Sequence, residues 1–174
     1  MFVRYVILAI LLIVAVAGDI RFYRIFNLPV ALGFAAGLVL NCVLGGFEGF
    51  VWSLLAAMLP AALLIALFVL RMLGAGDIKL LCAIGAIMGM PFVLLAMAYS
   101  FLAGGIMSVG IMFFRGNLKQ RIGHIANYLK TCFLTHSLMP YADFGDKSDG
   151  AKFHFSLAIA AGCSIQILLS AISV

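Results

Sequence analysis

Two acidic residues stand where long apolar segments of the chain begin or end. Asp19 follows the apolar run 2–18, and Asp77 follows Gly74 and Gly76 just before another run. A carboxyl group at the mouth of a membrane helix is costly, so its default interpretation is functional. Two carboxyl groups at one water-poor site cannot both ionise easily, and one of them keeps a proton. Such a pair supplies a base that activates water and an acid that protonates a peptide oxygen or nitrogen.

The competing interpretation is that both acids are solvated residues at helix ends. Arg21 and Arg24 follow Asp19 closely and offer it partners at the membrane surface, whereas Asp77 lies between Gly76 and a new apolar run. We expect Asp19 and Asp77 to form a catalytic pair. Gly76 is expected to adopt a positive φ.

Three residues around Asp77 are expected to shape the substrate site. Gly74 and Gly76 should leave room for an extended substrate backbone. Lys79 has three interpretations: it tunes the aspartates, holds a lipid phosphate, or extends to the membrane surface without a further role. Asn27 is expected to cap a helix. Asn41, within the expected span 28–44, is not expected to have a role.

No metal or other cofactor is expected. The three histidines have no ligand spacing, and the four cysteines stand alone and are expected to be buried free thiols. These residues are His124, His136, His154, Cys42, Cys82, Cys132 and Cys163.

The composition places the chain among multi-pass helical membrane proteins. Of its 174 residues 66% are hydrophobic and 10% are charged, which no water-soluble domain of this size matches. The net charge of +5 is spread over loops between apolar runs, so it does not indicate a nucleic-acid partner. The bilayer itself is the expected surrounding.

Six membrane spans are expected within a single transmembrane domain that covers residues 1–174. They are 2–18, 28–44, 50–70, 78–90, 92–114 and 153–172, with short turns at 45–49 and 90–91. The segment 115–152 is expected to carry a basic amphipathic helix, from Leu118 to Phe133, on the membrane surface. The first run also has features of a cleavable signal peptide, but the alternation of the later spans favours a retained span.

Basic residues orient these spans. Arg4 is on one side, and ten basic residues are on the other: Arg21, Arg24, Arg71, Lys79, Arg115, Lys119, Arg121, Lys130, Lys147 and Lys152. This asymmetry predicts that both termini lie outside and that both aspartates face the cytoplasm. The span 78–90 is short: about 20 Å of helix against a hydrocarbon core of about 30 Å. Asp77 is therefore expected slightly below the membrane surface.

The motif around Asp77 resembles that of a known family. Gly74-Ala75-Gly76-Asp77 is similar to the GxGD signature of intramembrane aspartyl proteases, and Asp77-Ile78-Lys79-Leu80 extends it to the GxGDxKL form of type IV prepilin peptidases. The segment 19–27 resembles the first aspartate segment of that family, with Phe26 where Pro is usual. The last span resembles a family motif of the form Pro-Tyr-Gly, with His154 and Phe155 at its first two positions.

The resemblance covers nearly the whole chain and is strongest to the small Flp/Tad-pilus branch. It implies an aspartic endopeptidase of the bacterial inner membrane that removes the cytoplasmic leader of prepilins or pseudopilins, contacting the leader and the N-terminal helix. This branch lacks the cysteine-rich insert of the enzymes that also N-methylate pilins, so methylation is not expected. Ser156, in the less similar last span, is expected to matter little.

Two alternatives remain open from the sequence. A preflagellin peptidase has the same aspartate pair, so the sequence does not separate it from a prepilin peptidase. A small ion-coupled transporter or a scaffold subunit, from a different class, also holds acids within the membrane. Transporters of that kind usually show repeats or helices broken at the midplane, whereas both acids here are expected near one face.

Overall fold

The computed structural model describes residues 2–70, 72–114 and 154–172. These residues form helices and no strand: α1 (Phe2–Phe22), α2 (Asn27–Val69), α3 (Ala75–Met88), α4 (Met90–Phe114) and α6 (Phe155–Ile172). The expectation of an all-helical chain is therefore confirmed for this part. The amphipathic helix expected within 115–152 lies outside the described residues.

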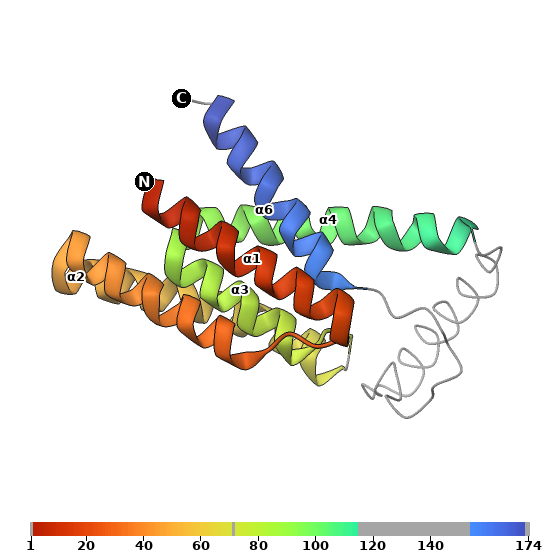
Figure 1. The fold of residues 1–174 in the computed structure, drawn as a ribbon, viewed down its shortest axis with the longest axis horizontal. Helices are drawn as coiled ribbons and strands as arrows, with labels where there is room; N and C mark the ends of the chain where they lie inside the picture. The colour runs from red at the N-terminus through yellow and green to blue at the C-terminus, as the bar shows by residue number, and fades with distance from the viewer. Residues whose placement is uncertain (1, 71, 115–153, 173–174) are drawn as a thin grey trace.

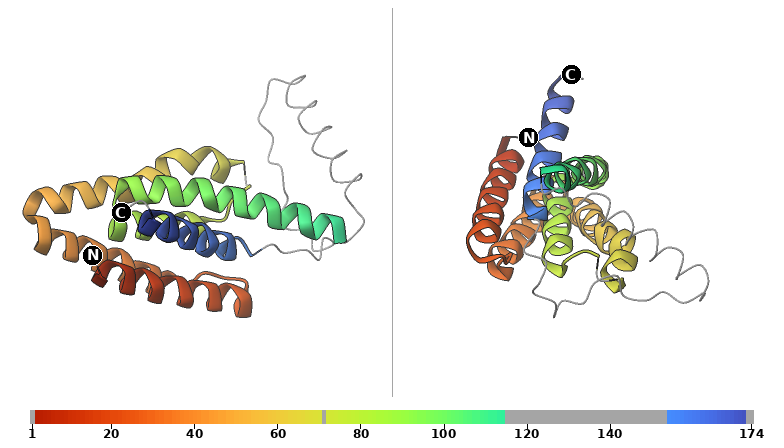
Figure 2. Two further views of the ribbon diagram at one scale, coloured as in Figure 1. Left: turned by 90° about the horizontal axis from the view of Figure 1, so that it is seen from above. Right: turned by 90° about the vertical axis from the view of Figure 1, so that its right-hand side faces the viewer.

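Helix α2 folds back on itself at Gly46. The backbone of this residue has φ 61° and ψ −150°, a conformation that glycine adopts without a steric penalty. The two arms of α2 then run in opposite directions (Figure 2), and Asn41 of the first arm donates to Ser53 of the second at 3.4 Å. The arms correspond to the second and third expected spans, and the reversal lies inside the expected turn 45–49.

Within the described ranges, four helices are long and apolar enough to cross a membrane, so the protein is a multi-pass membrane protein. They are α1, α2, α6 and the part of α4 from Met90 to Ile111. Helix α3 has 14 residues, which corresponds to about 21 Å of helix. It is thus too short to cross a hydrocarbon core of about 30 Å by itself.

Three expected boundaries were wrong, and two of them move an aspartate into a helix. Helix α1 continues to Phe22, so Asp19 lies in its last turn rather than in a polar connection. Helix α3 begins at Ala75, which puts Asp77 in its first turn. The chain turns at Gly89, with φ 92°, and not at Met90 and Pro91. These two residues begin α4, where the missing N–H of a proline costs little.

Helix α3 is the central helix of the bundle, and its aliphatic side chains from Leu80 to Ile87 are fully buried. It packs mainly against α2, where glycines allow the backbones to approach closely. A Cβ on Gly37 would lie 2.7 Å from the backbone of Ala86, and a Cβ on Gly85 would collide with the carbonyl of Ala56. Small residues at such contacts are typical of membrane helices. They fix α3 against both arms of α2.

A polar cluster closes the C-terminal end of α3, where the last carbonyl groups of a helix have no partner within it. The amide of Asn41, from the first arm of α2, donates to the carbonyl of Ala86 at 2.8 Å. Ser53 donates to the same carbonyl at 2.6 Å, and Arg4 donates to Asn41 Oδ1. Asn41 is therefore a buried cap for a neighbouring helix, which corrects the expectation that it has no role.

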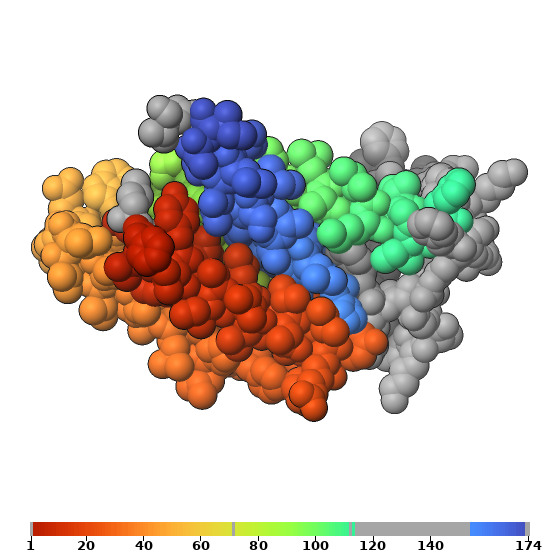
Figure 3. Space-filling model, turned by 45° about the horizontal axis from the view of Figure 1, so that its top comes forward, coloured from red at the N-terminus to blue at the C-terminus, as the bar shows by residue number. Residues whose placement is uncertain are grey.

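The opposite end of the bundle gathers three helix ends that are far apart in the sequence. The C-terminal end of α1 and the N-terminal ends of α3 and α6 lie together there (Figure 1). On one face of the molecule α6 lies beside α1 (Figure 3). Residues at these three ends can therefore contribute to a single site.

Candidate active site

Asp19 is held at the end of α1 by a contact from the last helix. It is partly buried, and its Oδ2 atom accepts a hydrogen bond of 2.6 Å from the hydroxyl of Ser156 in α6. Ser156 is fully buried. A hydrogen bond of this length between a hydroxyl and a carboxylate belongs to the strong class. The structure thus gives Ser156 a direct contact with the acid, which the sequence did not predict.

The chain leaves α1 through an unusual backbone conformation at Tyr23. Its φ is 53°, in the left-handed region that non-glycine residues rarely adopt, and its N–H donates to the carbonyl of Asp19 at 2.8 Å. The ring of Tyr23 packs edge-on against His154, with 4.7 Å between ring centroids. This packing joins the end of α1 to the start of α6 beside Asp19.

Asp77 is the third residue of α3, and Gly74 is the N-cap. Its carboxyl group accepts a hydrogen bond from the backbone N–H of Gly74, as an acidic side chain at this position does in a capping box. A Cβ on Gly74 would lie 3.1 Å from Asp77 Oδ2. Gly74 therefore has two functions: its N–H orients the carboxyl group, and its missing side chain leaves space for it.

Gly76 is needed for close packing rather than for an unusual backbone. It lies inside α3 and does not have a positive φ, so the expectation of a positive φ was wrong. A Cβ at this position would lie 3.2 Å from the Cβ of Ile25. The connection between α1 and α2 therefore rests directly on the first turn of α3. This contact brings the end of α1 to Asp77.

Asp19 and Asp77 line one cavity of about 390 Å³. Its other lining residues come from the connection between α1 and α2 and from the start of α3: Tyr23, Arg24, Ile25, Asn27, Gly74, Ala75, Gly76 and Lys79. The cavity thus contains Gly74, Gly76 and Lys79, the three residues expected to shape a substrate site. The sequence separation between the two acids is bridged by the close contact at Gly76.

The electrostatics of the cavity favour a retained proton on Asp77, which lies just before the fourth expected span. Burial, and secondarily the nearby charge of Asp19, raises the pKa of Asp77 to about 7, although the N–H of Gly74 lowers it in part. Among the described residues, neither carboxyl group forms an ion pair with a basic side chain, so Arg21 and Arg24 do not pair with Asp19.

Lys79 is directed to a neighbouring helix and not to the acids. Its Nζ donates to Asn27 Oδ1 at 3.1 Å, and both residues are exposed. Asn27 is the first residue of α2 and makes no capping hydrogen bond with its side chain, so the expectation that it caps this helix was wrong. The pair joins the starts of α2 and α3 at the rim of the cavity.

A second cavity, of about 500 Å³, borders Asp77 on another side and is lined mainly by apolar residues. They are Leu67, Met72, Leu73, Phe101 and Phe155, together with Gly74. The ring centroids of Phe101 and Phe155 lie 5.6 Å apart. Asp77 is therefore shared by a polar cavity and an apolar one.

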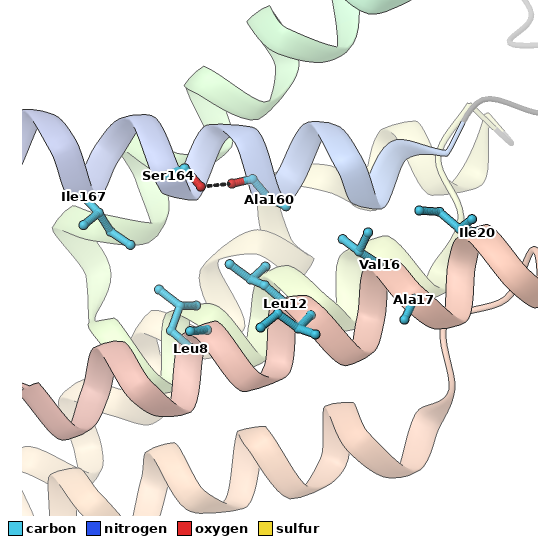
Figure 4. Close-up of a pocket in the computed structure, with 10 residues that line it drawn as sticks. Leu8, Leu12, Val16, Ala17, Ile20, Ala160, Ser164 and Ile167 are labelled. Atoms are coloured by element: carbon cyan, nitrogen blue, oxygen red, sulfur yellow. Dashed lines mark hydrogen bonds between the residues drawn. The ribbon is translucent and has the colours of Figure 1, made fainter.

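An apolar groove of about 570 Å³ runs between α1 and α6 (Figure 4). Leu8, Leu12, Val16 and Ile20 line it from α1, and Ala160 and Ile167 line it from α6. Ser164 also borders the groove, but its hydroxyl donates to the carbonyl of Ala160 in its own helix. This face thus presents almost only apolar groups, as suits a surface inside a bilayer.

All the cysteines were expected to be buried, but the structure shows that this was wrong for Cys42. Cys163 is buried and Cys82 is partly buried, whereas Cys42 is exposed on α2. Cys132, His124 and His136 lie outside the described residues. Within the part of the chain that the structure describes, no three side chains of metal-binding type lie together.

Comparison with known proteins gives one positive result. The model of the type IV leader peptidase family matches residues 6–109, a range that contains Asp19, Gly74, Gly76 and Asp77. Neither the curated proteins nor the solved structures provide a match. Because the family model covers more than half of the chain, the protein belongs to the type IV leader peptidase family.

Proposed function

We propose that the protein is an aspartic endopeptidase in which Asp19 and Asp77 are the catalytic pair. The observation that carries the proposal is that two acids, from different helices, line one cavity without a basic partner among the described residues. Solvated acids at helix ends would need no shared cavity. The raised pKa of Asp77 supports a pair that holds one proton near neutral pH.

The chemistry requires only the two carboxyl groups and water. One ionised carboxylate takes a proton from a water molecule, whose oxygen attacks the peptide carbonyl carbon. The protonated carboxyl group donates its proton to the carbonyl oxygen, and the resulting diol collapses as the amide nitrogen is protonated. No metal or other cofactor takes part in this proposal.

The proposed substrate is the junction between the leader of a prepilin or pseudopilin and its hydrophobic N-terminal helix. Such a junction is polar on one side of the scissile bond and apolar on the other. Of the two cavities that meet at Asp77, one is polar and the other is mainly apolar. We place the leader in the polar cavity and the first apolar residues after the cut in the cavity with Phe101 and Phe155.

The proposed setting is the bacterial inner membrane, with the active site facing the cytoplasm and the chain forming one transmembrane domain. In this arrangement the two arms of α2 and the short α3 complete six spans, and both termini lie outside. The ten basic residues on the side of the aspartates support this orientation. A type IV leader peptidase of the small Flp/Tad-pilus kind, without N-methylation, fits the chain best. The surrounding bilayer is its other partner.

Co-expression with candidate substrates tests the proposal. A prepilin, a pseudopilin and a preflagellin are each expressed with the protein, and loss of the leader is followed on a gel. Cleavage of the prepilin or pseudopilin is expected, whereas cleavage of the preflagellin alone would support the alternative substrate class. A transporter or scaffold subunit would cleave none of the three.

Substitution of the two acids tests their role. Asp19→Asn and Asp77→Asn should each abolish cleavage, because asparagine keeps the size of aspartate but cannot exchange a proton. Glu48→Gln is a matched control, because Glu48 is exposed near the reversal of α2 and its carboxylate accepts from Trp52. All three variants should appear in the membrane fraction. Cleavage that persists in either Asp variant would remove that residue from the pair.

A further inference from the structure

The hydroxyl of Ser156 donates to a carboxylate, whereas other serine hydroxyls of the membrane helices donate to backbone carbonyl groups. Ser100, Ser164 and Ser170 donate to carbonyl groups of their own helices, and Ser53 donates to that of Ala86 in α3. Ser156 is the second residue of α6, so no preceding turn of this helix offers it a carbonyl. It donates instead to Asp19, 137 positions away in the sequence.

We propose that Ser156 is a positioning residue that keeps Asp19 ionised and correctly oriented as the base of the catalytic pair, which leaves Asp77 as the residue that carries the proton. This inference rests on the proposed function. A hydroxyl that donates to a carboxylate stabilises its charged form and fixes one of its two oxygens. The other oxygen of Asp19 is then available to a water molecule in the shared cavity.

The surroundings of the two acids agree with this division of roles. The titratable or charged groups that line the cavity with Asp19 are Tyr23, Arg24, Asp77 and Lys79, and His154 packs against the ring of Tyr23. Among the described residues, neither of the two basic groups, Arg24 and Lys79, forms an ion pair with Asp19. The donor that the structure records on its carboxylate is the hydroxyl of Ser156. Asp77 receives a backbone N–H and is otherwise desolvated.

The proton balance of the reaction follows from these roles. Asp19 takes a proton from water as the new bond between carbon and oxygen forms, and Asp77 gives its proton to the carbonyl oxygen. When the bond between carbon and nitrogen breaks, Asp19 passes its proton to the leaving amine. A hydroxyl of the diol returns a proton to Asp77 as the carboxylic acid product forms. Ser156 keeps its own hydrogen throughout.

The test compares Ser156→Ala with Ser156→Thr, by measuring leader cleavage of a purified prepilin over a range of pH. Alanine removes the donor without adding volume, and threonine retains a hydroxyl. Ser156→Ala should lower kcat about tenfold with little change in KM. It should also move the acidic limb of the pH profile upward by about one unit, which corresponds to the same tenfold effect. Ser156→Thr should bring the acidic limb back toward that of the wild type.

Ser164→Ala is the matched control, because the hydroxyl of Ser164 bonds within its own helix. It should cleave as the wild type does. An unchanged acidic limb in Ser156→Ala would overturn the inference, whether kcat stays the same or falls equally at every pH, since either result leaves Ser156 with a structural role alone. A wild-type protein that cleaves no substrate would instead overturn the proposed function.

Discussion

Substitution of Gly76 gives a sharp test of how the two aspartates are brought together. The Cβ of a substituted residue would lie 3.2 Å from the Cβ of Ile25. Carbon atoms in favourable contact are about 3.5–4.0 Å apart, so Gly76→Ala requires a displacement of roughly 0.3–0.8 Å. The Cβ of Ile25 is attached directly to the backbone, so the connection between α1 and α2 must move with it.

This displacement would separate Asp19 from Asp77. A misplacement of about 1 Å at a catalytic site can cost about a hundredfold in rate. We expect Gly76→Ala to reduce leader cleavage about tenfold. Gly76→Val, whose two methyl groups crowd Ile25 further, should reduce it about a hundredfold. The assay is the initial rate of leader loss from a prepilin in membranes with equal amounts of each variant.

Gly105→Ala is the matched control, because a Cβ on this α4 residue would meet nothing within 4 Å. It should retain the wild-type rate. A second variant, Gly76→Ala combined with Ile25→Gly, should recover part of the activity, since it removes the Cβ of Ile25 that the new methyl group meets. Normal cleavage by Gly76→Val would refute the inference that close packing at Gly76 positions the aspartates. The segment 74–77 would then only connect two helices.

Two further predictions concern the acids and the opposite end of α3. Activity should be bell-shaped with pH, falling where a proton is added to the pair or lost from it. Its alkaline limb should lie near pH 7, because Asp77 must keep its proton and its pKa is raised to about 7. EDTA should leave this profile unchanged, whereas loss of activity that zinc restores would mean that the acids are metal ligands. Asn41→Leu should lower the free energy of unfolding by about 3 kcal/mol, because the buried carbonyl of Ala86 loses a donor and Arg4 loses its acceptor. Thermal unfolding in detergent measures this loss, and an unchanged midpoint would show that water replaces the amide.

Hydropathy alone predicts most of the helical architecture, because a membrane helix must be apolar over its whole length. The reversal between the arms of α2 and the start of α6 were therefore placed nearly correctly. Helix ends were predicted less well, since polar residues such as Asp19 and Arg21 can occupy a last turn as well as a loop. The position of the turn after α3 depended on the conformation of a single residue, Gly89.

The site was predictable only where one short segment carries the signal. The segment from Gly74 to Asp77 can be recognised by its two glycines and its acid. Asp19 can be recognised because it stands at the end of an apolar run. The contacts of Ser156 and Asn41 were missed because each depends on which side of a helix faces another helix far away in the sequence. One signal existed for Ser156: a hydroxyl stands where the similar family motif has glycine.

In the proposed arrangement, the polar cluster at the end of α3 sets the depth of the two aspartates in the membrane. Ala86, which accepts from Asn41 and Ser53, is nine residues beyond Asp77, or about 14 Å along the helix axis. Because α3 is a short rigid rod, fixing one end sets the height of the other. In the proposed orientation, contacts at the outer side of the membrane therefore fix the height at which the peptide bond is cut. The substrate itself enters from the cytoplasmic side.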